Sequence, residues 1–397
     1  MKLWQRNLTV SWITQIISLT GFNFVLPFLP YYIQELGVKS TVELNTWVGL
    51  ISSAPALLMG IMAPIWGFLA DKLGRKLMIL RAMLGGSIII SLMGVARNVE
   101  TVFILRCLQG LFTGSITASA TLIAAGTPDD KLSFSLGFLS SSNFIGLSIG
   151  PLIGGLLAEF LGFRTTIFSG AALIFVGFLM VLFFIREAET TPSKTMPKPE
   201  HFSVKHIMRQ PFIFIFTIVF LLRFSRMLPI PFIPLYIQEL QGTMKGASAL
   251  TGLISAGRGV AAAAAGLTLA RLGDRYDRRR LISILLIIAG GVSLPMFWTR
   301  GLPLFTLFFV FSSYFFGGVE PTLQSFMSTH TPPQSRGIIF GIQTSVGSLG
   351  WFLAPLFGSG LSIFLGTKTV FLFYSVSIFL AFAVTWVYRG TGFQKKS

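Results

Sequence analysis

Charged side chains inside long apolar runs are the residues of this chain whose types and spacing could do chemistry. Arg106, Arg223, Arg226 and Arg258 each interrupt a run long enough to cross a bilayer, and Glu320 is the one clearly central acid among these runs. An arginine at mid-depth in a membrane costs about 2.5 to 3.5 kcal/mol on insertion scales, so a functional origin has to be considered for each. Arg223 and Arg226 are three positions apart and therefore share one helix face.

Two interpretations of this arginine surplus are open. In the first, Glu320 neutralises one arginine and backbone carbonyls cap the others, so that the charges are structural. In the second, the surplus creates a positive cavity for an anionic or amphiphilic small molecule, because a guanidinium group offers a planar fork of donors to a carboxylate or phosphate. The polar residues that we expect to bind substrate are Asn23, Arg106, Gln109, Asn143, Arg223, Arg226, Arg258, Tyr314, Glu320 and Gln343.

Coupling to protons requires a group whose pKa can cross the working range, and the three histidines all fall outside the apolar runs. Glu320 is the first candidate, since burial would raise its pKa and a nearby arginine would lower it. We expect Glu320, with Arg106, to perform this role. The proton gradient would then be the energy source, and no cofactor is expected.

The composition places these residues in a polytopic membrane protein. Of 397 residues, 53% are hydrophobic and only 11% are charged, and the mean hydropathy is +0.75. The net charge of +17 falls in short clusters between apolar runs rather than on one amphipathic face, which argues against a nucleic-acid partner. A single cysteine, and the lack of a metal, nucleophile or phosphate-binding motif, argue against a metal site and against an enzyme.

Twelve apolar runs are long enough to cross about 30 Å of hydrocarbon. They lie at 8–30, 46–69, 77–96, 100–124, 135–160, 165–186, 211–238, 247–270, 281–299, 303–329, 338–364 and 370–389. With both termini cytoplasmic, the inner segments hold 21 lysines and arginines, among them the four at 72–81 that end with Arg81, and the outer loops hold six, as the positive-inside rule requires. The predicted fold is therefore an all-α membrane protein of twelve helices.

An internal repeat divides the twelve runs into two sets of six. The segments 27–36 and 231–240 share eight identities in ten, at an offset of 204 residues. We predict an N-terminal six-helix bundle at 1–186, a cytoplasmic linker at 187–210 and a C-terminal six-helix bundle at 211–397. A parallel repeat of this kind places a substrate cavity near the membrane midplane, between the halves.

Three motifs in the first half resemble signatures of the major facilitator superfamily. They are the loop sequence G-x-L-x-D-x-x-G-R-K at 67–76, the R-x-x-x-G pattern at 106–110 and the glycine-proline pattern at 146–155. The resemblance implies a gating motif and an antiporter motif. Its gating residues would be Gly67, Asp71, Gly74, Arg75 and Lys76, with Asp274 and Arg278 in a degenerate copy at 270–279. Its antiporter residues would be Gly146, Gly150, Pro151, Gly154 and Gly155.

The structural interpretation of the glycine-proline pattern is that its small residues allow close helix packing. The functional interpretation adds a bend at Pro151, which lacks a backbone donor. The second half departs from the first, since Val310 stands where the repeat would place another Arg106.

The segments 4–8, 27–38 and 77–81 resemble in particular the MdtG-type multidrug resistance proteins of bacteria. This resemblance implies a proton-coupled exporter of small molecules that works by alternating access, as a monomer, in the bacterial cytoplasmic membrane. The alternative is a dedicated exporter of one organic anion, such as a carboxylate siderophore, which the arginine surplus favours.

Asp71 is either a solvated loop charge or a latch that binds the start of the eleventh span, near Ile338, because a helix N-terminus attracts a carboxylate. As a latch, Asp71→Asn should nearly abolish transport but leave expression and substrate binding in detergent intact, whereas Asp274→Asn should be tolerated better. Transport in proteoliposomes checks both. Full transport by Asp71→Asn would exclude the latch, and equal losses would exclude a difference between the two copies.

Overall fold

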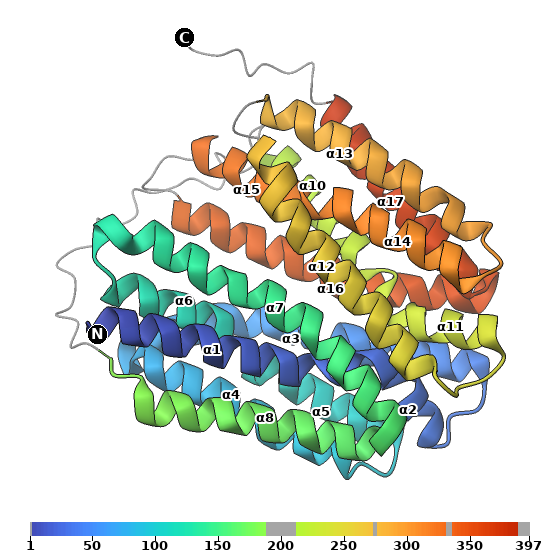
Figure 1. Ribbon diagram of the computed structural model, residues 1–397, viewed down its shortest axis with the longest axis horizontal. Helices are drawn as coiled ribbons and strands as arrows, with labels where there is room; N and C mark the ends of the chain where they lie inside the picture. The colour runs from blue at the N-terminus through green and yellow to red at the C-terminus, as the bar shows by residue number, and fades with distance from the viewer. Residues whose placement is uncertain (1, 188–211, 273–275, 331–335, 388–397) are drawn as a thin grey trace. The chain divides into compact units, whose positions relative to one another are not determined.

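The computed structural model describes residues 2–187, 212–272, 276–330 and 336–387 (Figure 1). In this part of the chain the regular structure is helical, with no strand. Twelve segments of it are helices long and apolar enough to cross a membrane. The predicted fold class of an all-α protein with twelve spans is thereby confirmed.

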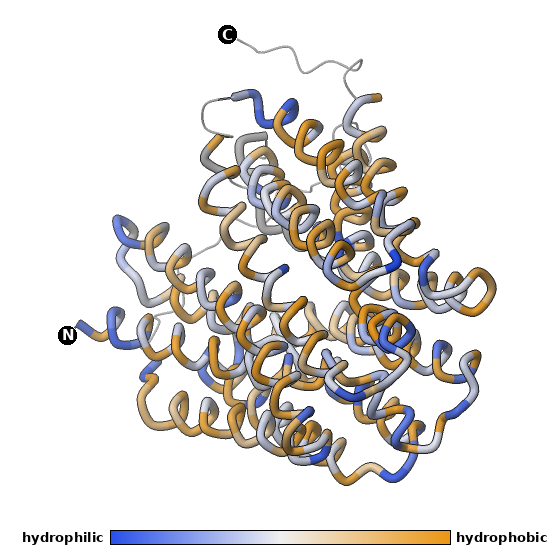
Figure 2. The backbone as a smooth tube through the Cα atoms, turned by 45° about the vertical axis from the view of Figure 1, so that its right-hand side comes forward, coloured by the Kyte–Doolittle hydropathy of each residue, from blue (hydrophilic) through white to orange (hydrophobic). Residues whose placement is uncertain are grey.

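The sequence before residue 188 forms the first six spans. Their elements are α1 (Leu3–Asn23), η1 (Leu26–Phe28), α2 (Leu29–Glu35), α3 (Thr41–Leu73), α4 (Arg75–Gly94), α5 (Val99–Phe112), α6 (Ser115–Gly126), α7 (Asp129–Leu161) and α8 (Phe163–Phe184). The next six spans comprise α10 (Phe212–Met227), η2 (Ile230–Phe232), α11 (Ile233–Gln241), α12 (Ala247–Leu272), α13 (Arg278–Ser293), η3 (Leu294–Phe297), α14 (Leu302–Gly317), α15 (Val319–His330), α16 (Arg336–Leu365) and α17 (Thr367–Val387). Hydrophobic residues dominate the helices, and hydrophilic residues gather mainly near their ends (Figure 2).

Four spans are interrupted, at matching places in the two repeats. The first and seventh change to a short 3-10 turn where Pro27 and Pro231 remove backbone donors. The fourth is broken between α5 and α6, and the tenth between α14 and α15. The apolar runs gave no sign of the breaks in the fourth and tenth spans, because hydropathy is continuous across them.

The described helices fall into two compact units. One unit is Met1–Lys194 with Pro231–Val260, and the other is Thr195–Ile230 with Ala261–Ser397. The boundaries that we predicted at 186 and 210 follow the sequence repeat rather than these contacts, and they stay a prediction.

The glycines of α7 bring it close to α1 in the first unit. An added Cβ on Gly150 would lie 2.8 Å from the Thr20 carbonyl oxygen, and one on Gly154 would overlap the Phe24 backbone. On the neighbouring face of α7, Pro151 presents its carbonyl oxygen 2.5 Å from where a Cβ of Gly252 would stand. Small residues therefore let three helices pack at backbone distance, and α7 continues without interruption through Pro151.

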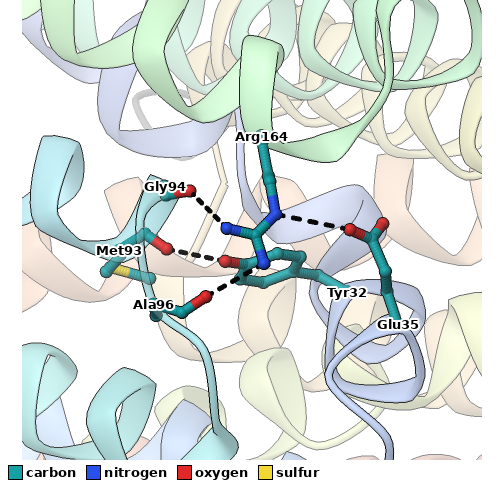
Figure 3. A network of polar contacts seen from close by, with 6 residues as sticks. All are labelled: Tyr32, Glu35, Met93, Gly94, Ala96 and Arg164. Carbon is teal, nitrogen blue, oxygen red and sulfur yellow. Dashed lines mark hydrogen bonds and ion pairs between the residues drawn. The ribbon is translucent and has the colours of Figure 1, made fainter.

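Side chains cap the end of α4 in the same unit. Arg164, at the start of α8, donates to the carbonyl oxygens of Gly94 at 3.1 Å and Ala96 at 3.0 Å (Figure 3). The Tyr32 hydroxyl donates to the Met93 carbonyl oxygen at 2.7 Å. The terminal carbonyls of a helix have no intrahelical donor, so these contacts supply the missing partners and join α2, α4 and α8.

Glycine also allows close helix packing in the second unit. Helix α10 packs against α16 and α17, and α13 packs against α14 and α17. An added Cβ on Gly350 of α16 would lie 2.7 Å from the Phe220 carbonyl oxygen of α10. Gly350 stands 204 positions after Gly146, whose Cβ would lie 2.6 Å from Leu19 of α1, so the two repeats use the same close contact.

Gly150 offers a direct test of this packing. Gly150→Ala should destabilise the protein by about 1 to 3 kcal/mol, because the new methyl group overlaps backbone that cannot move aside. Gly137→Ala, on the same helix, is the matched control, since its Cβ would meet no described atom within 4 Å. Thermal unfolding in detergent measures both, and equal stability of the two variants would contradict the packing role of Gly150.

Candidate functional site

A three-residue ion cluster lies in the second unit. Arg223 and Arg226 project from α10, and Glu320 stands in the first turn of α15, just after the break in the tenth span. The Glu320 carboxylate places Oε1 2.5 Å from Arg223 Nη2 and Oε2 2.8 Å from Arg226 Nη1. Each carboxylate oxygen thus binds a different guanidinium group. Two cations share one anion, so the cluster retains one positive charge.

An aromatic side chain completes this cluster. The Arg223 guanidinium carbon lies 4.8 Å from the ring centre of Trp351 on α16, in a cation–π contact. Gly347, one turn earlier, leaves room for the arginine, since an added Cβ would lie 3.3 Å from Arg223 Cγ. The three side chains of the cluster keep 25 to 35% of their surface exposed. Trp351 was not predicted, because an aromatic residue in an apolar run gives no signal of its own.

Arg106 and Gln109 lie together on α5 in the first unit. Pro55 of α3 has no N–H, so the Ile51 carbonyl four residues earlier loses its intrahelical donor. Arg106 Nε donates to this carbonyl oxygen at 3.3 Å, and Arg106 Nη1 donates to Gln109 Oε1 at 2.8 Å. Arg106 is 7% exposed. The buried cation that we expected to bind substrate therefore also satisfies a carbonyl freed by a proline.

The two predicted asparagines each have a hydrogen-bond partner within the first unit. Asn23 Nδ2 donates to the Leu19 carbonyl oxygen at 2.7 Å, within α1. Asn143 of α7 accepts a hydrogen bond from Gln15 Nε2 at 2.6 Å. Gln15 is buried and was missed, although an amide in the middle of the first apolar run was a usable signal.

The remaining predicted substrate residues are distributed over both units. Tyr314 shares a hydrogen bond of 2.8 Å with Thr268, between α14 and α12. Gln343 is buried in α16. Arg258 is half-buried in α12 and belongs to the first unit, whereas Glu320 belongs to the second. A joint site of these residues stays a prediction.

The gating motif is fixed by a carboxylate that the sequence did not point to. Gly74 takes a φ of 92°, and the following backbone amides of Arg75 and Lys76 donate to the two oxygens of Glu187, at 2.7 and 3.1 Å. Glu187, at the end of the sixth span, therefore caps the N-terminus of α4. Lys76 Nζ also donates to the Leu182 carbonyl oxygen at 2.9 Å.

The aspartates predicted for gating lie outside this description. The side chain of Asp71 and the whole of Asp274 fall outside the described residues, so the latch stays a prediction. Arg278 begins α13, and the neighbouring Asp277 caps that helix by accepting from the Arg280 amide at 2.8 Å. The corresponding helix starts in the two repeats thus use different carboxylates.

Comparison with known proteins identifies the class of the chain. The family model described as Major Facilitator Superfamily matches residues 11–251 and 215–396. The multidrug resistance protein MdtG of Salmonella arizonae is 34% identical over 375 residues, which cover 93% of this chain and 91% of that protein. The MdtG protein of Salmonella typhimurium is 35% identical with the same coverage.

Solved structures share the fold at low identity. An inward-facing, occupied bacterial homolog of the human lysosomal transporter Spinster matches with a TM-score of 0.82 at 16% identity, covering 100% of both chains. The human organic anion transporter MFSD10 matches with a TM-score of 0.69 at 18% identity, covering 97% of this chain and 100% of that one.

The pairing of Pro55 with Arg106 predicts a measurable coupling. Arg106→Ala leaves the Ile51 carbonyl without a donor, but Pro55→Ala returns a backbone N–H to that carbonyl. We expect Arg106→Ala to destabilise the protein less in the Pro55→Ala background, with an interaction of about 0.5 to 3 kcal/mol. Thermal unfolding of the two single variants and the double variant gives this value. Strict additivity would contradict the assignment.

Proposed function

Since the chain belongs to the major facilitator superfamily and is a multi-pass integral membrane transporter, we propose that it is a proton-coupled exporter of drug-like small molecules. The MdtG relatives are named for multidrug resistance, and their similarity extends over nearly the whole chain. We place the protein in the bacterial cytoplasmic membrane. It would act as a monomer by alternating access, with the proton gradient as its energy source and without a cofactor.

The position of Glu320 between Arg223 and Arg226 is the observation that supports proton coupling most directly. While Glu320 is deprotonated and no substrate is bound, its carboxylate bridges the two guanidinium groups and ties α15 to α10. Protonation of Glu320 removes the negative charge and opens this bridge. An anionic group of a substrate opens it as well, by taking the place of the carboxylate on the guanidinium groups.

Either event therefore releases the same connection between two spans. A transporter that changes state only when the bridge is open would reach the outward-facing state with substrate bound. It would return to the inward-facing state with Glu320 protonated. That cycle exchanges substrate for protons, as an antiporter does, and it uses only groups that the cluster contains. The closed bridge prevents the empty, deprotonated protein from cycling.

The charge of the cluster also bears on substrate class. A lipophilic cation beside Arg223 and Arg226 meets an excess of like charge in a weakly screened environment, whereas an anion is attracted there. Trp351 adds an aromatic surface next to Arg223. We therefore expect amphiphilic compounds with an anionic group and an apolar or aromatic body to bind better than cations.

A dedicated exporter of one organic anion, such as a carboxylate siderophore, is the second candidate. The fixed pair of guanidinium groups favours it, because two such groups suit one carboxylate geometry well. Compounds that accumulate in cells lacking the protein, compared with cells overproducing it, distinguish the two functions. Many unrelated compounds would favour the drug exporter, and a single anion would favour the dedicated one.

Substitutions in the cluster separate binding from coupling. Arg223→Lys and Arg226→Lys should each weaken binding of an anionic substrate about tenfold despite keeping the charge, since lysine loses the planar fork, and alanine at either position should weaken it further. Glu320→Gln should uncouple export from the pH gradient more than it weakens binding. Direct binding to purified protein and transport in proteoliposomes with an imposed pH gradient measure these effects.

Arg300→Lys, at a predicted outer loop, is the control for a general effect of the exchange. Tight binding of cations that survives alanine at both Arg223 and Arg226 would refute the preference for anions. Export by Glu320→Gln that still follows the imposed pH gradient would refute the proton role.

A further inference from the structure

The break in the fourth span leaves backbone groups without intrahelical partners inside a segment long and apolar enough to cross a membrane. Helix α5 ends at Phe112, Thr113 is extended with φ −67° and ψ 169°, and Gly114 takes a φ of 126° before α6 begins. The final carbonyls of a helix lack donors. In hydrocarbon each unsatisfied group costs several kcal/mol, so a break is tolerated only where the protein supplies partners.

Two of the carbonyls at this break receive donors from other helices. Within the segment itself, the amide and hydroxyl of Thr113 donate to the carbonyl oxygens of Gln109 and Gly110, at 3.1 and 2.8 Å. From α3, Trp66 Nε1 donates to the Leu111 carbonyl oxygen at 2.7 Å. From α4, Arg81 Nη2 donates to the Thr113 carbonyl oxygen at 3.2 Å.

Arg81 and Trp66 also contact each other. The guanidinium carbon of Arg81 lies 3.3 Å from the ring centre of Trp66, so the two planar groups stack. Arg81 stands almost two turns inside α4, although the charge pattern had grouped it with the cytoplasmic lysines and arginines. The stacked pair connects α3 and α4 to the last turn of α5 and to Thr113 in the break, and we call it the Arg81–Trp66 brace.

The tenth span provides an internal comparison, because it is broken at the matching position of the repeat. Leu285 stands 204 positions after Arg81, and Ala270 stands 204 positions after Trp66. Gly318, the equivalent of Gly114, has an ordinary helical φ of −77°, and an added Cβ there would lie 3.1 Å from Leu285 Cδ1. The same position thus contacts the break in both repeats, with a guanidinium group in one and an apolar side chain in the other.

We propose that Arg81 and Trp66 are positioning residues: their brace fixes the angle between α5 and α6, and thereby the place of Arg106 and Gln109 on α5. The functional half of this inference rests on the proposed export function, whereas the structural half does not. Arg106 lies about two turns before the break, so a change of angle there would displace it. The break in the fourth span is in this way held by a guanidinium group and an indole, whereas the equivalent of Arg81 at the tenth span, Leu285, contacts the break through an apolar side chain.

Spin labels on the two sides of the break test the brace without any substrate. Cysteines at Ile104 and Ala124, both exposed, are labelled in a background in which Cys107 is replaced by serine, and their distance distribution is measured in the full chain. We expect Arg81→Ala to broaden this distribution. Trp66→Phe, which keeps a ring but removes the donor to Leu111, should broaden it to a smaller extent.

Leu285→Ala is the matched control, since it alters the equivalent contact at the other break and should leave the distribution between the labels narrow. An unchanged distribution in both Arg81→Ala and Trp66→Phe overturns the proposal. Equal broadening in Leu285→Ala also overturns it, because the effect would then be a general loosening. Arg81→Lys retains the charge without the planar stack, and it should resemble Arg81→Ala more than the unmodified protein.

Transport of carboxyfluorescein, a fluorescent organic anion, tests the functional half in proteoliposomes with a pH gradient. We expect Arg81→Lys to raise the KM about tenfold, the effect of misplacing one charged hydrogen bond, with a smaller change in maximal rate. A broadened distance distribution with an unchanged KM overturns the positioning role. Absence of transport by the unmodified protein would instead count against the proposed function, and the distance measurement would still decide whether the brace exists.

Discussion

A backbone carbonyl inside a bilayer has to find a donor within the protein, and this constraint accounts for several side chains that look anomalous in an apolar span. Pro55 frees the Ile51 carbonyl, and Arg106 binds it. The break after α5 frees further carbonyls, and Trp66 and Arg81 bind two of them. These side chains are expensive to bury, but the backbone groups that they satisfy would be at least as expensive to leave alone. Arg81 and Arg106 in the first six spans are therefore explained in part by the places where a proline or a helix break leaves a carbonyl without its donor.

The second unit meets a different requirement with the same residue type. Arg223 and Arg226 bind a carboxylate rather than backbone, and the break before α15 places Glu320 in the first turn of a helix, where a negative charge is favoured. One carboxylate cannot neutralise two guanidinium groups, so the cluster retains one positive charge. A bridge of this kind is well suited to respond to a proton or to an anion, because either one changes its charge by a whole unit. Structural pairing and ligand binding, which looked like alternatives in the sequence, are two states of one cluster in the function that we propose.

The sequence predicted the twelve spans and the repeat because both follow from properties that act along the chain: hydropathy over about 20 residues, and identities at a constant offset. It did not predict the breaks in the fourth and tenth spans, since Gly114 and Gly318 lie within continuous apolar runs and a glycine alone does not end a helix. Contacts between residues far apart in the sequence could not be predicted either. Glu187 caps a helix that begins 112 residues earlier, and its neighbours in sequence indicated a linker. Arg81 was grouped with the cytoplasmic charges because charge counting cannot distinguish a topological signal from a side chain that binds neighbouring helices.

The contact between Arg106 and the carbonyl that Pro55 frees bears on how the two halves diverged after duplication. At the equivalent positions of the second half stand Gly259 and Val310, so the proline and the arginine are absent together. An arginine without the proline would be a buried cation without that acceptor, and a proline without the arginine would leave an orphaned carbonyl in the membrane. Either residue without the other would leave a buried polar group without this partner, so the effects of the two residues on stability are expected to depend on each other. The arginine of the fourth span is therefore linked to a proline of the second span, and the second half, which lacks that proline at the equivalent position, also lacks the arginine.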